Sequence, residues 1–378
     1  MHTARLFLSP PHMSGHELRY VEEAFASNYV APAGPMLKAF EAEFATYAGI
    51  PHTVAVASGT AAIHLALKSL DLSDGDEIWA STLTFIGSVV PVVHERLTPV
   101  FIDADEKSWT LDSNILKEEL ARAAKKGRLP KAVIPSDLYG QSCDLDAILA
   151  ACSEFEVPVI CDSAEAVGAR YKDRHAGSGA FATAFSFNGN KIITTSGGGL
   201  LASHDKRVVD RARYLSTQAR QPTVHYEHTE VGFNYRMSNI CAAIGRGQLE
   251  VLGERIERRR SIFARYHELL KDVPGISFMP EAPYGRATRW LTVLCIDPQL
   301  FGADRETVRR ALESANIESR PVWKPMHLQP VFRETPHFGG RVSERLFTQG
   351  LCLPSGTQMS DSDVSVVVEI VQNAGTPH

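Results

Sequence analysis

Short apolar runs alternate with helical segments over the first two hundred residues, and this rhythm constrains the fold most strongly. The seven runs are Thr53–Ala57, Glu77–Ala80, Pro99–Asp103, Ala132–Pro135, Pro158–Asp162, Thr183–Phe187 and Gly199–Ala202. Such alternation predicts an α/β protein with a mainly parallel sheet and helices on both faces. Little sequence separates the last two runs, so that pair can be antiparallel.

The flanking segments predict further elements and a division of the chain. We expect one helix near Ser14 to Asn28 with Ser14 as N-cap, and another near Met36 to Ala48 that Gly49 ends. The later elements are a charged helix over 240–270, a strand over 290–296, a helix over 304–314, a strand over 317–321 and a helix from 360. This pattern predicts a large domain (36–250), a smaller C-terminal α/β domain (251–378) and an N-terminal segment (1–35) that packs on the small domain.

Charge and composition exclude several classes of protein. The net charge is −5 with mixed signs, which argues against a nucleic-acid binder. No apolar run reaches the length of a membrane span, and the N-terminus lacks a signal-peptide core, so we expect a cytoplasmic protein. The six cysteines form no C-x-x-C pair and the histidines show no metal-ligand spacing, so we predict no metal.

Two candidate catalytic residues follow apolar runs. Lys191 ends the stretch Ser186-Phe187-Asn188-Gly189-Asn190-Lys191, just before a run of three glycines. Asp162 closes an apolar run, where an acid is costly unless it is paired. A carboxylate there can hold a proton on a pyridine nitrogen, as pyridoxal-phosphate (PLP) chemistry requires. Considered separately, each residue has an ordinary alternative: a surface-loop lysine and a helix N-cap.

Two further motifs add a phosphate site and a ring contact. In Ser58-Gly59-Thr60, a small-residue turn opens a helix, and helix N-termini bind phosphate readily. Phe85 follows the second run and could stack on an aromatic ring. Each motif alone is also typical of a capping turn or a core aromatic. Together the four parts form a PLP site, because ligands bind at the carboxyl ends of parallel strands.

With these residues the chain resembles the DegT/DnrJ/EryC1/StrS sugar aminotransferases, whose fold is PLP-dependent fold type I (aspartate-aminotransferase-like). The resemblance covers nearly the whole chain and adds the motifs Asp162-Ser163-Ala164-Glu165-Ala166 and Gly232-Phe233-Asn234-Tyr235-Arg236-Met237. It implies a seven-stranded, mainly parallel sheet in the large domain, PLP as cofactor and a homodimer with shared active sites.

The resemblance also implies roles for individual residues. Lys191 bonds the cofactor covalently, and Asp162 pairs with its ring nitrogen. The other implied cofactor contacts are Gly59, Thr60, Phe85, Glu165, Ser186, Asn188 and Asn234, with Asn234 reaching the neighbouring subunit. Glu165 stands where many relatives carry Gln.

A proline-rich segment around Trp323 resembles the branch of the family that acts on UDP-linked 4-keto-6-deoxy sugars. The implied substrate contacts are Arg320, Trp323, Lys324, His327 and Tyr226. Cations at these positions suit a diphosphate, and an indole face suits a sugar or base. Without the resemblance, the segment also fits an ordinary loop around a buried Trp.

The predicted reaction is transfer of an amino group from L-glutamate to such a nucleotide sugar, giving a 4-amino sugar nucleotide for glycan or polysaccharide synthesis, as in bacillosamine-type pathways. The alternatives are a GDP-perosamine synthase-like enzyme, a 3-keto-sugar aminotransferase, or a non-catalytic regulatory descendant of the fold. The sequence does not fix the nucleotide, the sugar, the stereochemistry of amination or assembly beyond a dimer.

Overall fold

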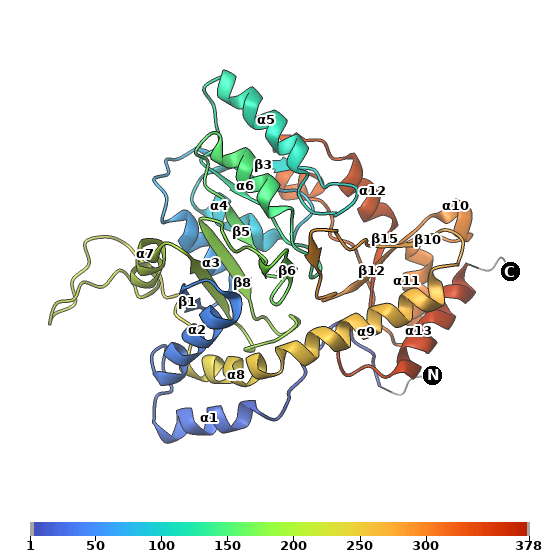
Figure 1. The fold of residues 1–378 in the computed structure, drawn as a ribbon, viewed down its shortest axis with the longest axis horizontal. Coiled ribbons are helices and arrows are strands. Elements are labelled where there is room, and N and C mark those ends of the chain that lie inside the picture. The colour runs from blue at the N-terminus through green and yellow to red at the C-terminus, as the bar shows by residue number, and fades with distance from the viewer. Residues whose placement is uncertain (1–3, 376–378) are drawn as a thin grey trace.

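The computed structural model describes residues 4–375 and contains a central twisted sheet flanked by helices (Figure 1). Two four-stranded halves, β1-β9-β8-β5 and β14-β3-β2-β4, meet through parallel bridges from Val133 to Val159 and from Ser136 to Asp162. Strand β9 runs antiparallel to both β1 and β8, whereas β14 with β3, β3 with β2, β2 with β4 and β5 with β8 are parallel pairs. The mainly parallel sheet is therefore confirmed, and its last two strands are antiparallel.

All seven apolar runs form strands of this sheet. Their bounds are β1 His52–Val56, β2 Glu77–Ser81, β3 Thr98–Ile102, β4 Ala132–Ile134, β5 Ile160–Asp162, β8 Ala182–Ser186 and β9 Gly199–Ser203. A short strand from the C-terminal region, β14 (His337–Phe338), pairs with β3 and was not predicted. Its two residues were too few to give a periodic signal.

Helices cover both faces of the sheet because side chains alternate between its faces. In β8, Ala184 faces the core made with α3 (Gly59–Leu67), α4 (Val90–His94) and α7 (Lys206–Ser216), while Phe185 faces the opposite core. That opposite face is covered by α2 (Pro35–Ala48), α5 (Ser113–Lys125), α6 (Leu145–Ser153) and α8 (Asn239–Glu250). Burial of both faces explains why the strands read as continuous apolar runs.

The C-terminal third builds a separate antiparallel sheet in the order β10-β12-β15-β13. Its strands are β10 Ile276–Phe278, β12 Thr292–Ile296, β13 Arg320–Pro321 and β15 Gly350–Leu353. The helices of this region are α9 Leu252–Leu270, α10 Pro298–Phe301, α11 Arg305–Ser314, α12 Arg341–Gln349 and α13 Asp361–Ala374. Helices α9, α11 and α13 share one apolar core with this sheet. The short strands β6 (Arg170–Tyr171), β7 (Arg174–His175) and β11 (Gly285–Arg286) form a small third sheet.

The first predicted helix is shorter than expected and is capped differently. Helix α1 spans Glu17–Ala26 with His16 at its N-cap, so the prediction of Ser14 as N-cap is wrong. Instead the Glu17 carboxylate accepts hydrogen bonds from the Ser14 backbone N–H and hydroxyl and from the Gly15 N–H. Burial acts to raise the pKa of Glu17, but hydrogen bonds from Ser14 and from the Gln248 side chain outweigh it and lower the pKa to about 2.

The predicted helix over 240–270 is two helices, α8 and α9, which are separated at Val251. Helix α8 packs beside α1 and α2, and α9 continues into the C-terminal region (Figure 1). Near the N-terminus, Leu6 bridges Ile317, and the Leu8 carbonyl accepts from the Ser355 N–H. The domain boundaries at 36 and 251 stay predictions.

One long segment between α7 and α8 extends away from the body of the protein (Figure 1). Its apolar side chains Val224, Tyr226 and Val231 are exposed. Among the described residues, no helix has both the length and the apolar character needed to cross a membrane.

Candidate active site

An inner cavity of about 280 Å³ lies where β5 and β8 end and α3 begins. Its lining includes residues predicted for the cofactor site: Gly59, Thr60, Phe85, Asp162, Glu165, Ser186, Asn188 and Lys191. They come from four short segments that are separated in the sequence but converge at the carboxyl edge of the sheet. Convergence at this edge is the arrangement expected of an open α/β sheet.

Lys191 projects into this cavity from a turn that follows β8. The Lys191 backbone N–H donates to the Asn188 carbonyl at 2.9 Å. Its Nζ lies 3.7 Å from Glu165 Oε1 and 4.2 Å from the centre of the Trp290 ring. The side chain is only 12% exposed. The surface-loop alternative for Lys191 therefore does not hold.

Asp162 ends β5, and its carboxylate is held by two donors. The Ala164 N–H donates to Oδ1 at 3.0 Å, and the Ser88 hydroxyl donates to Oδ2. Burial raises the pKa of Asp162, while the bonds from Ser88 and Ala164 and the nearby Lys191 act to lower it. Turns follow Asp162 instead of a helix, so it is not an N-cap.

Glu165 is buried beside Lys191 and joins two aromatic residues to it. Its Oε2 accepts from the Tyr139 N–H at 2.9 Å, and its Oε1 accepts from the Trp323 indole N–H at 3.2 Å. Burial raises the pKa of Glu165, and the charge of Lys191 acts to lower it. The carboxylate is therefore available as a partner for a cationic Lys191.

The start of helix α3 forms an anion cradle at one side of the cavity. Ser58 is the N-cap, and its hydroxyl accepts from the Ala61 N–H at 3.0 Å. A Cβ added at Gly59 would lie 3.1 Å from the Ser186 Cβ, so glycine leaves the cradle open. A Cβ at Gly199 would lie 2.2 Å from the Ser58 carbonyl carbon, which explains the glycine at that position.

Phe85 is 54% exposed, so the alternative of a core aromatic does not hold. Its ring centre lies 5.5 Å from that of Trp323. Both rings border the inner cavity and also a larger outer cavity. They therefore stand where the two cavities meet.

The outer cavity has a volume of about 800 Å³ and an apolar lining. Predicted substrate contacts Arg320, Trp323 and Lys324 line it. Arg320 pairs with Glu318 at 2.8 Å. Within residues 4–375 the Lys324 ammonium has neither a hydrogen bond nor an ion pair, so its charge is free to meet an anion.

Three predicted contacts lie outside both cavities. His327 is buried, with Nδ1 bonded to the Thr82 hydroxyl at 2.6 Å and Nε2 facing Glu344 at 3.1 Å. Both ring nitrogens are thus engaged within the protein, and the structure gives His327 a packing role. Tyr226 lies on the extended loop, beneath the Arg220 guanidinium, and Asn234 is exposed at the base of that loop. The structure does not bring these two into their own subunit's cavities.

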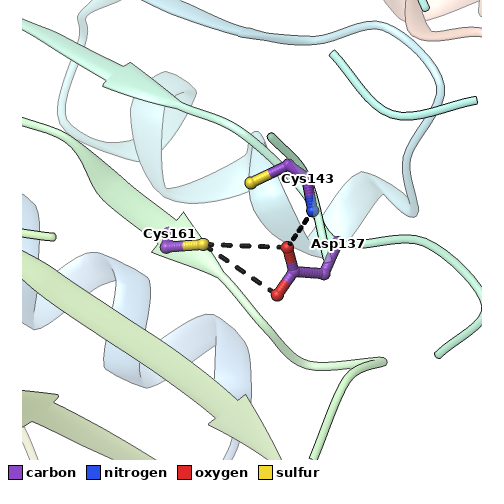
Figure 2. Close-up of side chains that lie close together, drawn as sticks. All are labelled: Asp137, Cys143 and Cys161. Atoms are coloured by element: carbon purple, nitrogen blue, oxygen red, sulfur yellow. Dashed lines mark hydrogen bonds between the residues drawn. The ribbon is translucent and has the colours of Figure 1, made fainter. Parts of the chain in front are cut away.

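A buried group beneath Asp162 contains Asp137, Cys143 and Cys161 (Figure 2). Their ligand-type atoms lie within 4.8 Å of one another. The Asp137 carboxylate accepts from the Cys143 N–H at 2.8 Å and from the Ser163 hydroxyl at 2.6 Å. Burial, with the nearby Asp162 adding to it, raises the pKa of Asp137 to about 6. These bonds link the turn after β4 to the end of β5, so the close approach of the three residues is explained by a structural role.

Comparison with known proteins decides the family. The model of the DegT/DnrJ/EryC1/StrS aminotransferase family matches residues 11–372. The chain belongs to this family. It is 46% identical to the putative pyridoxal phosphate-dependent aminotransferase EpsN of Bacillus subtilis, over 97% of this chain and 95% of EpsN. It is 35% identical to the GDP-perosamine synthase of Caulobacter vibrioides, over 96% of each chain.

Solved structures agree with the sequence relatives. The structure of DesI in the presence of its TDP-sugar product superposes with a TM-score of 0.90 and 27% identity, covering 100% of this chain and 94% of DesI. The family, the fold class and the PLP cofactor are therefore confirmed, and the protein is a PLP-dependent sugar aminotransferase.

The donor set of the inner cavity fits PLP. Lys191 supplies the amine, Asp162 a buried carboxylate for a ring nitrogen, and Phe85 an aromatic face. The α3 N-terminus with Thr60 and Ser186 supplies donors for a phosphate. Individual roles for these residues stay predictions.

Sequence reasoning missed several residues of the site. Trp290 contacts Lys191, Ser88 bonds Asp162, and Tyr139 supports Glu165. Tyr139 adopts a φ of 50°, which is unusual for a bulky residue and gives no signal in a sequence. The N-terminal segment 7–11 lines the outer cavity although it was predicted only to pack on the small domain.

Proposed function

We propose that this aminotransferase moves an amino group from L-glutamate to a nucleotide-linked 4-keto-6-deoxy sugar, with UDP as the first candidate nucleotide. The product would be a 4-amino sugar nucleotide for glycan or polysaccharide synthesis in the cytoplasm. One observation carries the proposal: the cavity of Lys191 meets a larger cavity at Trp323 and Phe85, and no group among residues 4–375 pairs with the Lys324 ammonium there. A sugar at the junction would leave its diphosphate and nucleotide in the outer cavity.

The names of relatives support this substrate class. They include GDP-perosamine synthases, a spore coat polysaccharide biosynthesis protein of Bacillus subtilis and a UDP-4-amino-4-deoxy-L-arabinose–oxoglutarate aminotransferase. These proteins differ in nucleotide and sugar, so they favour a sugar nucleotide without choosing one. The GDP-linked alternative rests on the perosamine synthases and the 3-keto alternative on no observation of its own.

The residues of the inner cavity would divide the proton chemistry. Bound PLP supplies an electron sink for the charge left when a carbon beside the amino group loses its proton. Asp162 would hold the proton of the ring nitrogen. The Lys191 amine would take the proton from the α-carbon of the amino donor and later deliver one to the former keto carbon of the sugar. Glu165 would balance the charge of Lys191 whenever that amine is free and protonated.

The outer cavity would bind and orient the substrate. Lys324 and Arg320 would contact the diphosphate, and Trp323 would offer its face to the sugar. Asn234 and Tyr226 lie outside their own subunit's cavities, so we assign them to the site of a partner in a homodimer. Exposed apolar residues on the same loop favour burial against another chain.

A substrate panel tests the function. Purified holoenzyme is incubated with L-glutamate and with 4-keto and 3-keto sugars linked to UDP, GDP or TDP, and the products are identified by mass spectrometry. We expect a UDP-linked 4-keto-6-deoxy sugar to gain an amino group fastest. Faster amination of a GDP-linked or 3-keto substrate would select an alternative, and no amination of any member would refute the proposal.

Mixing two inactive variants tests the shared site. Lys191→Ala and Asn234→Ala proteins are purified separately and then combined under conditions that exchange subunits. Random reassortment makes half the dimers mixed, each with one intact site, so about a quarter of wild-type activity should return. If no activity returns in dimers shown to be mixed, the assignment of Asn234 to the partner's site is wrong.

A further inference from the structure

The N-terminal strap, residues 7–11, forms one wall of the outer cavity. Phe7 is 50% exposed, and Leu8, Ser9, Pro10 and Pro11 join it in the lining. The rest of the lining includes residues more than three hundred positions later, among them Arg320 and Phe347. A half-exposed aromatic ring at the edge of an apolar cavity can be buried by a bound ligand.

Hydrogen bonds fix the strap in place. The Leu8 N–H donates to the Glu318 carboxylate at 3.1 Å. The Ser9 hydroxyl donates to the Asn190 carbonyl at 2.7 Å and accepts from the Arg259 guanidinium at 2.9 Å. Arg259 is buried, and no carboxylate pairs with it among the described residues. The strap is therefore held directly against the residue that precedes Lys191.

The cavity has two distinct ends. Trp323 stands at the junction with the inner cavity, whereas Phe7 follows Leu6, which bridges Ile317. The segment between Glu318 and Trp323 spans at most about 16 Å if fully extended, at about 3.3 Å per residue. Arg320 lies between those two positions in the chain. Along the segment from Ile317, which Leu6 bridges, to Trp323, the cavity lining therefore presents Phe7, then Arg320 and then Trp323.

We propose that Phe7 stacks on the nucleobase of the sugar nucleotide and that the strap is the base-binding wall of the site. This inference rests on the proposed function, and it adds the position of the base. The order of the wall places the base on Phe7, the diphosphate beside Arg320 and the sugar beside Trp323. Stacking recognises any planar base, so Phe7 contributes affinity, and the choice among bases falls to polar neighbours such as Glu318.

Nucleotide binding to the holoenzyme provides the test. UDP, GDP and TDP are titrated separately by calorimetry into wild-type protein, Phe7→Ala and Phe7→Tyr. The matched control is Phe25→Ala, which removes another exposed phenylalanine, on α1, that lines neither cavity. We expect the best-bound nucleotide to lose about 5- to 150-fold in affinity in Phe7→Ala, because base stacking is worth ~1–3 kcal/mol. Phe7→Tyr and Phe25→Ala should bind as wild type does.

The outcomes separate this inference from the proposed function. An unchanged visible absorbance and melting temperature in Phe7→Ala would show that the cofactor site and the fold are intact. Nucleotide affinity within twofold of wild type in Phe7→Ala would overturn the inference, as would wild-type protein that binds none of the three nucleotides. Weakened nucleotide binding together with no amination of any keto sugar would support the base site while refuting the proposed reaction.

Discussion

The inner and outer cavities are built in different ways. The inner cavity is made of short motifs at strand ends, where backbone geometry fixes Lys191, Asp162 and Gly59 within a few residues of regular structure. The outer cavity is assembled from the strap, the segment around Trp323 and α12, which lie at opposite ends of the chain. Under the proposed function, the chemistry common to the family would lie on the rigid sheet, and substrate selection would lie on segments that can vary independently.

The two cavities also differ in how their charged groups are buried and paired. The inner cavity buries Asp162, Glu165 and Lys191 close enough that the charge of Lys191 acts to lower the pKa of both carboxyl groups, so each depends on the others. In the outer cavity no described residue pairs with the Lys324 ammonium, and the Arg320 side chain is 65% exposed. Substitutions in the inner cavity should therefore abolish catalysis, whereas substitutions in the outer cavity should alter the affinity for the substrate.

Replacing Lys191 with Ala is the most severe test of the inner cavity. Loss of the amine removes both the covalent attachment and the proton carrier, so kcat should fall by at least ~10³-fold. The visible absorbance of the lysine-bound cofactor should also vanish. Lys206→Ala, an exposed lysine on α7, serves as the control and should match wild type. Ordinary turnover by Lys191→Ala would refute the catalytic assignment.

Asp162→Asn should be the next most damaging change. An amide can replace the bonds to Ser88 and Ala164 but cannot stabilise a proton on the ring nitrogen, so kcat should fall about 10²- to 10³-fold. Cofactor binding, followed by visible absorbance, should persist. A kcat within threefold of wild type would place the carboxylate outside the chemistry.

Trp323→Phe sharpens the comparison because Trp323 borders both cavities. Phenylalanine keeps an aromatic face but loses the hydrogen bond to Glu165, worth about 1 kcal/mol, so kcat/KM should fall roughly fivefold. The loss should appear as a higher KM. The pH profile of kcat/KM should also shift, because Glu165 titrates differently once its hydrogen bond from Trp323 is lost. A change in KM with an unaltered pH profile would limit Trp323 to substrate binding.

Asp137→Asn should have the smallest effect on activity and a measurable effect on stability. The pKa of Asp137, raised to about 6, means that the folded protein binds this proton more tightly than the unfolded chain. Its stabilising contribution is therefore complete at low pH and is lost as the pH rises through about 6. Relative to Asp137→Asn, wild-type unfolding free energy should decline by roughly 2–3 kcal/mol between pH 4 and 7. Parallel pH curves in denaturant titrations would contradict this.

Much of the inner site could be predicted because its signals are local. The strand that ends at Asp162, the turn before Lys191 and the capped start of α3 each lie within a few residues of sequence. Periodicity likewise predicted the sheet, and the capping box at Ser360 marked the last helix.

The rest depended on contacts that no local pattern records. The prediction of an N-cap at Ser14 was wrong because the Glu17 carboxylate accepts from the Ser14 hydroxyl. The separation of α8 from α9 was missed because the residue at the break is Val251 and not a glycine or proline. His327 suited a diphosphate by type, but long-range bonds to Thr82 and Glu344 engage its ring. The strap contributes through residues that look unremarkable in sequence. Features that depend on contacts between residues far apart in the sequence therefore could not be predicted from local sequence patterns.

The long-range contacts of the strap and of Leu6 beside it have a consequence for biogenesis. Leu6 bridges Ile317 and Leu8 accepts from Ser355, so each is synthesised long before its partner. These contacts can form only after the C-terminal region of the protein has been synthesised. Because residues 7–11 line the outer cavity, a C-terminal tag, which leaves the strap unaltered, is the safer choice for binding measurements.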